Sequence, residues 1–188
     1  RGGADRRSRL AVGHHDTTSL PIRPASTVVM LRDGSDGLEV WLQQRASTLA
    51  FAASMYAFPG GAVDPEDAEV ELPGVDVVRH ARAFGDADVQ VTIAYLAAAV
   101  RETEEESGVV LDASSLVPWA RWITPPGDTR RFDARFFVAP CPSDQSPRPL
   151  TGEVASGAWF VLQVAVDNHA AGGLPMWPPT ITTLVELV

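Results

Sequence analysis

A run of glutamates closes the longest helix that the sequence predicts. Apolar residues recur with helical spacing over residues 89–107: Ile93, Leu96, Ala97, Val100 and Thr103. Gly108 stands where a left-handed C-cap is expected to end the helix. At about 100° per residue, Glu102, Glu105 and Glu106 share one face, opposite the apolar stripe, whereas Glu104 does not. The sequence therefore predicts a helix that presents three neighbouring carboxylates.

Three carboxylates on one face repel each other, by roughly 0.2–0.5 kcal/mol per pair in water. A hard divalent cation such as Mg²⁺ would offset this repulsion, because it takes oxygen ligands and keeps positions open for water and phosphate oxygens. Arg101, next to Glu102, offers a fork of donors that can orient one carboxylate. The alternative interpretation is a solvated acidic helix face, which is common for isolated glutamate clusters.

The rest of the chain alternates strand-like and helical segments. Residues 1–23 are expected to be a flexible lead-in to a single domain over 24–188. Residues 26–31 and 38–43 predict a hairpin with its turn at 32–37, and Phe58-Pro59-Gly60-Gly61 is expected to break regular structure. Residues 64–88 are predicted to form an irregular loop with at most one short helix. Further strands are expected at 109–111, 119–123, 131–139 and 158–162, and a helix at 181–188 after Pro178-Pro179-Thr180. This order predicts an α/β or α+β layered domain.

Composition narrows the class of protein. The 15 basic residues are all arginines, so a lysine Schiff base and a phosphate-loop lysine are excluded. The net charge of −9 disfavours nucleic acid as a partner, because phosphate backbones would be repelled. No apolar run approaches the roughly 18 residues that span a bilayer, so no membrane partner is expected. The single cysteine, Cys141, cannot form an internal disulfide, which fits a cytoplasmic protein.

The glutamate helix resembles the Nudix hydrolases, whose box reads G-x(5)-E-x(7)-R-E-U-x-E-E-x-G-U, with U a bulky apolar residue. The fixed positions of its second half are matched by Arg101, Glu102, Glu105, Glu106, Gly108 and Val109, while Thr103 replaces the usual aliphatic residue. The box glutamate falls on Asp67 when counted from Gly61 and on Glu66 when counted from Gly60. Residues 68–100 stand where the family has seven residues, so the resemblance implies an insertion at about 68–90. It also implies an α/β/α sandwich with a mixed sheet.

The segment before the box is similar to the coenzyme A diphosphatases of that family, which carry L-L-T-x-R-[SA]-x(3)-R-x(3)-G-x(3)-F-P-G-G. The matching residues are Leu42, Arg45, Ala46, Phe58, Pro59, Gly60 and Gly61. This chain has Gln43, Ala50 and Ser54 where that branch has threonine, arginine and glycine. Residues 130–137 and 174–180 also look like the insertion-bearing branch. The resemblance therefore favours coenzyme A or acyl-CoA as the substrate.

What the resemblance implies is hydrolysis of a diphosphate linkage with Mg²⁺ or Mn²⁺ as cofactor. It assigns Glu102, Glu105 and Glu106 as metal ligands, with a carbonyl from Gly60, and Arg101 as the residue that fixes a carboxylate. The proton acceptor is either a box glutamate or Glu153. The alternative interpretation of Glu153 is a charged residue on a surface loop. Substrate contacts are expected from Arg45, Gly61 and Arg131.

Two other functions remain open at this point. One is hydrolysis of ADP-ribose, a dinucleotide or another nucleoside diphosphate derivative, and the other is a Nudix fold that senses a ligand with little hydrolysis. A homodimer is also left open. Among the remaining residues, Trp119, Trp122 and Phe132 are expected either in the core or stacked on a base, and His14-His15-Asp16 either chelates a metal or is solvated.

Overall fold

A hairpin of two long strands forms the centre of the sheet. The structure, a computed structural model, describes residues 21–49 and 52–188; the predicted His14-His15-Asp16 chelator, Ala50 and most of the expected lead-in lie outside them. Strands β1 (Ile22–Gly34) and β2 (Gly37–Arg45) pair antiparallel, with Gly34 opposite Gly37. The predicted hairpin is confirmed, but its turn is only Ser35-Asp36, so both strands are longer than expected.

The sheet has seven strands and is mixed. The other strands are β3 (Tyr56–Ala57), β4 (Gly60–Ala62), β5 (Val117–Ile123), β6 (Arg131–Pro140) and β7 (Val154–Val161). The main path runs β3-β2-β1-β6-β5, with β4 paired to β1 and β7 paired to β2. β1 and β6 are parallel, whereas the other pairs are antiparallel. The expected break at residues 58–61 is therefore wrong in part, because Gly60 and Gly61 belong to β4.

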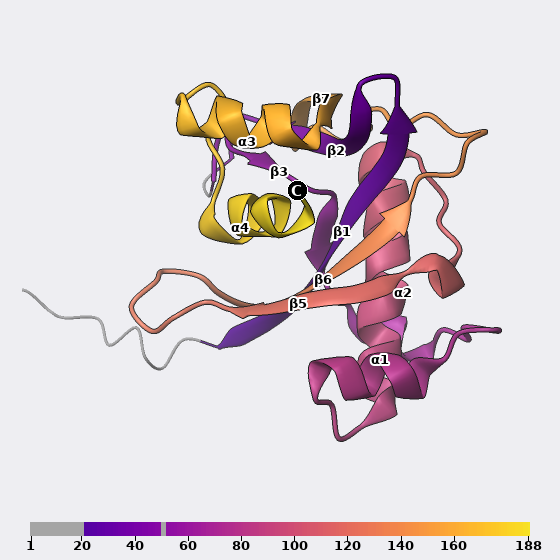
Figure 1. The fold of residues 1–188 in the computed structure, drawn as a ribbon. Helices are drawn as coiled ribbons and strands as arrows, with labels where there is room; N and C mark the ends of the chain where they lie inside the picture. The colour runs from indigo at the N-terminus through magenta and orange to yellow at the C-terminus, as the bar shows by residue number, and fades with distance from the viewer. Residues whose placement is uncertain (1–20, 50–51) are drawn as a thin grey trace, which may run out of the picture.

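Helices cover both faces of the sheet (Figure 1). They are α1 (Val77–Phe84), α2 (Val89–Ser107), α3 (Leu162–Ala170) and α4 (Pro178–Leu187), with short 3-10 turns η2 (Pro65–Glu69) and η3 (Ala113–Ser115). Alternation along β1 separates two cores: Val28 and Met30 pack with the α2 side, and Val29 packs with the α3 and α4 side. This arrangement is an α/β/α sandwich, as the sequence predicts.

Helix α2 has the predicted bounds and buries most of the predicted stripe, including Leu96, Ala97 and Thr103. Asp88 caps it by accepting from the backbone of Gln90, and Gly108 ends it at φ 72° with its N–H donated to Glu104. The expected stripe is wrong in part, because Ile93 and Val100 are only half-buried. Thr103 is fully buried and Glu106 is only 9% exposed. One of the three glutamates therefore faces the protein interior rather than solvent.

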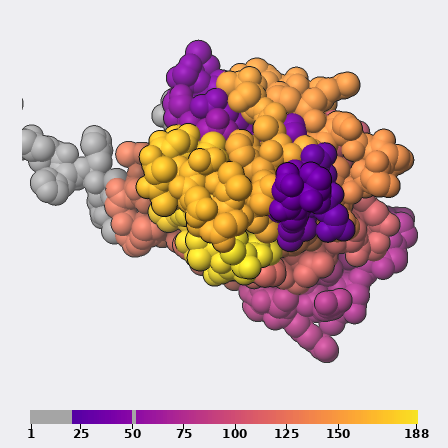
Figure 2. Space-filling view, turned by 45° about the horizontal axis from the view of Figure 1, so that its top comes forward, coloured from indigo at the N-terminus to yellow at the C-terminus, as the bar shows by residue number. Residues whose placement is uncertain are grey.

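The segment 64–88 packs against the body of the protein. Helix α1 buries His80, Ala81 and Phe84, and Asp86 forms a buried ion pair with Arg135 on β6. Figure 2 shows helix α1 and its neighbours in magenta, at the lower right of the view. Taken together, η2 and α1 give the segment 64–88 slightly more regular structure than expected.

Two further expectations about local structure are wrong. Residues 109–111 form no strand, and α3 begins directly after β7 where no helix was expected. Strands β5, β6 and β7 and helix α4 are confirmed with shifted ends. In the described part of the chain, no single helix has the length and apolar character to cross a membrane; α1 and α2 pass that test only as a pair bent by 99°.

Candidate active site

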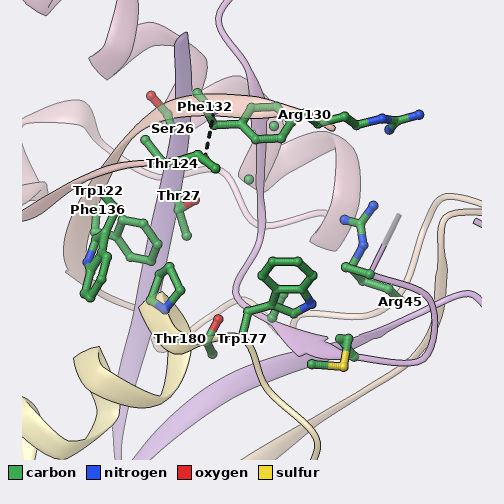
Figure 3. Close-up of a pocket in the computed structure, with 18 of the residues that line it drawn as sticks. Ser26, Thr27, Arg45, Trp122, Thr124, Arg130, Phe132, Phe136, Trp177 and Thr180 are labelled. Carbon is green, nitrogen blue, oxygen red and sulfur yellow. Dashed lines mark hydrogen bonds between the residues drawn. The ribbon is translucent and has the colours of Figure 1, made fainter. Parts of the chain in front are cut away.

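A pocket of about 770 Å³ opens where β1, β4, α2 and the start of α4 meet. The polar residues of its lining, below called the polar end, come from β1, β2, β4 and α2 and from a glutamate before β7: Ser26, Thr27, Arg45, Gly60, Gly61, Glu102, Glu106 and Glu153. The apolar residues, below called the apolar end, are Trp122, Phe132, Phe136, Trp177, Pro178 and Pro179. Figure 3 shows Phe132 and Trp177 on opposite sides of the cavity, with Arg45 at its margin. The pocket therefore suits a ligand with one charged and one apolar part.

Glu106 is held at the polar end by two donors. Its Oε2 accepts from the backbone N–H of Gly60 at 3.0 Å and from the side-chain amide of Gln43 at 2.9 Å. Burial raises the pKa of Glu106 to about 7, although these two hydrogen bonds act in the opposite direction. A positive charge near this carboxylate would therefore stabilise its ionised form.

The Glu102 carboxylate lies so close to Gly61 that a larger residue would not fit at position 61. Its Oε1 accepts from Nη1 of Arg101 at 2.8 Å. Burial raises the pKa of Glu102 above its usual value, and the hydrogen bond from Arg101 opposes that effect. A Cβ on Gly61 would collide with the Glu102 carboxylate, and one on Gly60, at φ 156°, would collide with the backbone of β1. Gly61 thus allows strand β4 to approach the acidic helix, and Gly60 allows it to approach β1.

Arg101 connects the acidic helix to the 3-10 turn η2, which contains Asp67. Its guanidinium donates to both carboxylate oxygens of Asp67, at 3.1 and 2.9 Å, and to the carbonyl of Ala62 at 3.0 Å. The hydrogen bond to Asp67 raises the pKa of Arg101, so this cation stays charged. Asp67 is only 4% exposed and also accepts from the backbone of Asp64 at 2.8 Å. Asp67 is the position of the box glutamate when the box is counted from Gly61, but no role for it was predicted from the sequence.

Glu105 occupies a different environment from the other two glutamates. Its carboxylate lies 3.5 Å from Nη1 of Arg101, its side chain is 54% exposed, and it does not line the pocket. Glu104 is exposed and does not line the pocket, which agrees with its expected separation from the other glutamates. Within residues 21–49 and 52–188, no three His, Cys, Asp or Glu side chains are grouped as a ready-made metal site. Two of the three predicted carboxylates therefore come together at the pocket.

The predicted substrate contacts divide in the same way. Of the expected substrate contacts, Arg45 and Gly61 line the pocket, as does Glu153, the expected proton acceptor. The Nε of Arg45 is buried, and no hydrogen-bond partner for it occurs in the part of the chain described. Arg131 does not line the pocket and donates to the carbonyl of Thr124 at 3.2 Å, whereas its neighbour Arg130 lines it. Neither Arg130 nor Gln43 was singled out by the sequence as a site residue.

The apolar end is built by the start of α4 and by β5 and β6. Trp122 and Phe132 line it, while Trp119 lies outside it and donates to Glu186 at 3.0 Å. Helix N-termini usually offer free N–H groups to anions. Here the first two positions of α4 are Pro178 and Pro179, which have none, and the N–H of Thr180 is already donated to Trp177. This end therefore favours an uncharged group over a phosphate.

A divalent cation fits the polar end of the pocket. Glu102 and Glu106 supply carboxylate oxygens, which such ions prefer. The space that a Cβ of Gly61 would fill is taken by the Glu102 carboxylate, which therefore lies directly against strand β4. The burial of Glu106 next to a second carboxylate is also the arrangement that a bound cation would stabilise.

Comparisons with known proteins agree with this geometry. No family profile matches the sequence. The chain is 25% identical over 163 residues to nudix hydrolase 7 of Caenorhabditis elegans, an alignment that covers 79% of this chain. It spans only 55% of that curated relative's length.

Solved structures give the fold. A crystal structure of a NUDIX hydrolase from Alicyclobacillus acidocaldarius matches with a TM-score of 0.77 and 28% identity, covering 90% of this chain and 92% of that one. The NUDIX domain of Shewanella oneidensis NrtR, complexed with ADP ribose, matches with a TM-score of 0.57 and 14% identity, covering 90% and 88%. These similarities show the fold and support the Nudix hydrolase family for this chain.

Proposed function

We propose that this chain is a metal-dependent Nudix-type diphosphatase whose preferred substrate is coenzyme A or an acyl-CoA. The observation that carries the proposal is the pocket itself, in which two carboxylates beside Gly61 lie at one end and aromatic and proline side chains at the other. A diphosphate joined to an organic group has the same two parts. The relatives named as nudix hydrolases support the same class of reaction.

The glutamates are assigned as the metal ligands. Glu102 and Glu106, with a carbonyl from Gly60, would hold Mg²⁺ or Mn²⁺ at the polar end, and Glu105 would complete the set. When bound, such an ion neutralises diphosphate charge and makes water a better nucleophile. This contribution matters here because the chain carries a net charge of −9 and would otherwise repel its substrate.

The remaining site residues would orient substrate and move a proton. Arg101 fixes Glu102 through the 2.8 Å hydrogen bond and is itself fixed by Asp67. Arg45 has a buried Nε directed to no other described group and is assigned to a phosphate oxygen. Glu153, which lines the same pocket, is assigned as the acceptor of the proton lost by the attacking water.

Turnover of coenzyme A tests this proposal. Water adds across the phosphorus–oxygen–phosphorus linkage, so the products are 3′,5′-ADP and phosphopantetheine. We expect both to appear in equal amounts, only with Mg²⁺ or Mn²⁺, and more slowly in the Glu106→Gln variant. No turnover of any coenzyme A species by the parent protein would contradict the substrate assignment.

A second candidate is a nucleoside diphosphate derivative such as ADP-ribose. It is favoured by one neighbour in fold, the NrtR domain, whose structure contains ADP ribose. The apolar end could stack a base as well as pack a pantetheine or acyl group. Assaying ADP-ribose and dinucleotides beside coenzyme A, with Mg²⁺, distinguishes the two, and binding without turnover would favour a sensing module instead.

A further inference from the structure

Gln43 occupies a buried position directly beneath the acidic helix. It lies on β2, between Ala57 of β3 and Gly157 of β7 in the sheet, and is only 2% exposed. Its side-chain amide donates to Oε2 of Glu106 at 2.9 Å. The contact joins the sheet to α2 across 63 positions of sequence. A rigid strand thus supports a carboxylate of the proposed site.

The two donors to Glu106 act on the same oxygen. Gly60 N–H and Gln43 Nε2 both bind Oε2, from two different strands. A carboxylate held by two donors at one oxygen has its plane and rotamer fixed, and its second oxygen is the one left for a cation. Glu106 lines the pocket, so this arrangement suits a ligand that binds through one oxygen.

The carbonyl oxygen of the Gln43 side chain argues against a purely structural role. Its Oε1 is buried, and no partner for it exists among the described residues. A buried acceptor without a hydrogen bond destabilises a folded protein, whereas an apolar side chain of the same size would not. The amide is therefore better explained by the hydrogen bond from its nitrogen to Glu106 than by a contribution to overall stability.

From these contacts we propose that Gln43 is a positioning residue, which fixes Glu106 so that one carboxylate oxygen faces the metal position. The inference rests on the proposed function, because it assumes that Glu106 binds the ion. It goes further by making the affinity for the ion depend on a residue of β2 that lies outside the glutamate helix and does not line the pocket.

Binding of Mn²⁺ to the substrate-free protein tests this inference. Free Mn²⁺ is measured by electron paramagnetic resonance during a titration of the parent and of the Gln43→Met variant, which keeps the volume of the side chain but removes the donor. We expect the variant to bind Mn²⁺ about 10- to 100-fold more weakly, the range found when a partner of a metal ligand is lost. Thermal unfolding without metal checks that the variant is folded.

The adjacent Gln44 supplies a matched control. It lies on the same strand but contacts Ser54 and Ser156 instead of Glu106. Gln44→Met should leave Mn²⁺ affinity within about twofold of the parent. Gln43→Asn, which keeps the amide but shortens its reach, provides a second variant should Gln43→Met fail to fold, and it should also weaken binding.

The outcomes separate the two proposals. Parent-like Mn²⁺ affinity in a folded Gln43 variant would overturn the positioning role and leave the proposed function intact. Equal losses in the Gln43 and Gln44 variants would also overturn it, because the effect would then be general to the strand. A parent protein that binds no Mn²⁺ would overturn both.

Discussion

The buried charge of Glu106 predicts how the stability of the metal-free protein depends on pH. Burial raises the pKa of this carboxyl to about 7 in the folded state, against a usual value of 4.5. The folded state therefore holds the proton more tightly than the unfolded state does. It follows that the free energy of unfolding falls as pH rises from about 4.5 to about 7, and that this effect is flat outside that range.

The size of the effect follows from the same values. The interval from 4.5 to about 7 is roughly 2.5 pH units, and each unit is worth about 1.36 kcal/mol. Glu106 alone thus lowers the free energy of unfolding by up to about 3 kcal/mol between acidic and neutral solution. Burial also raises the pKa of Glu102, so its contribution has the same sign.

Urea unfolding, followed by circular dichroism from about pH 5 to about pH 8 in a chelator, measures this dependence. The Glu106→Gln variant should lose most of the slope and exceed the parent in stability at pH 8, because it carries no buried charge. Saturating Mg²⁺ should stabilise the parent at pH 8 by about 2.7 kcal/mol at 100 times its Kd, and the variant by less. Parent and variant with the same pH slope would refute the argument.

Three further predictions concern single residues. Gly61→Ala should displace the Glu102 carboxylate, so Mn²⁺ affinity and turnover should fall at least tenfold. Thermal unfolding should show that the variant is folded, and unchanged metal affinity would contradict the packing described. Asp86→Ala should cost about 3–5 kcal/mol in urea unfolding, because Arg135 would stay buried without its partner; a loss below about 1 kcal/mol would show that the pair contributes little. Glu153→Gln should lower kcat at least a hundredfold with little change in KM, and a parent-like pH–rate profile would assign the proton to another group.

Local signals in the sequence were sufficient for the acidic helix. The apolar spacing and Gly108 predicted it, and Gly108 marks its C-terminal end through capping chemistry, which depends only on neighbouring residues. The β1–β2 hairpin could be predicted for the same reason, since its turn residues interrupt two apolar runs. In these places the local preference and the final fold agree.

Features that depend on the packing of distant segments were not predictable. The burial of Glu106 follows from the approach of β2 and β4 to α2, which the helical pattern alone does not show. The contact between Asp67 and Arg101 was not predictable because 34 positions separate the two residues in sequence. Helix α3 was missed because Leu162 continues the apolar run of β7 without a side-chain cap at its start.

The most direct test of the account is the position of a bound ion. Anomalous diffraction from crystals soaked in Mn²⁺ should show a peak within coordination distance of carboxylate oxygens of Glu102 and Glu106, next to Gly60 and Gly61. A fully occupied Mn²⁺ elsewhere, or none at this end of the pocket with both side chains as described, would contradict the central claim that these glutamates form a metal site.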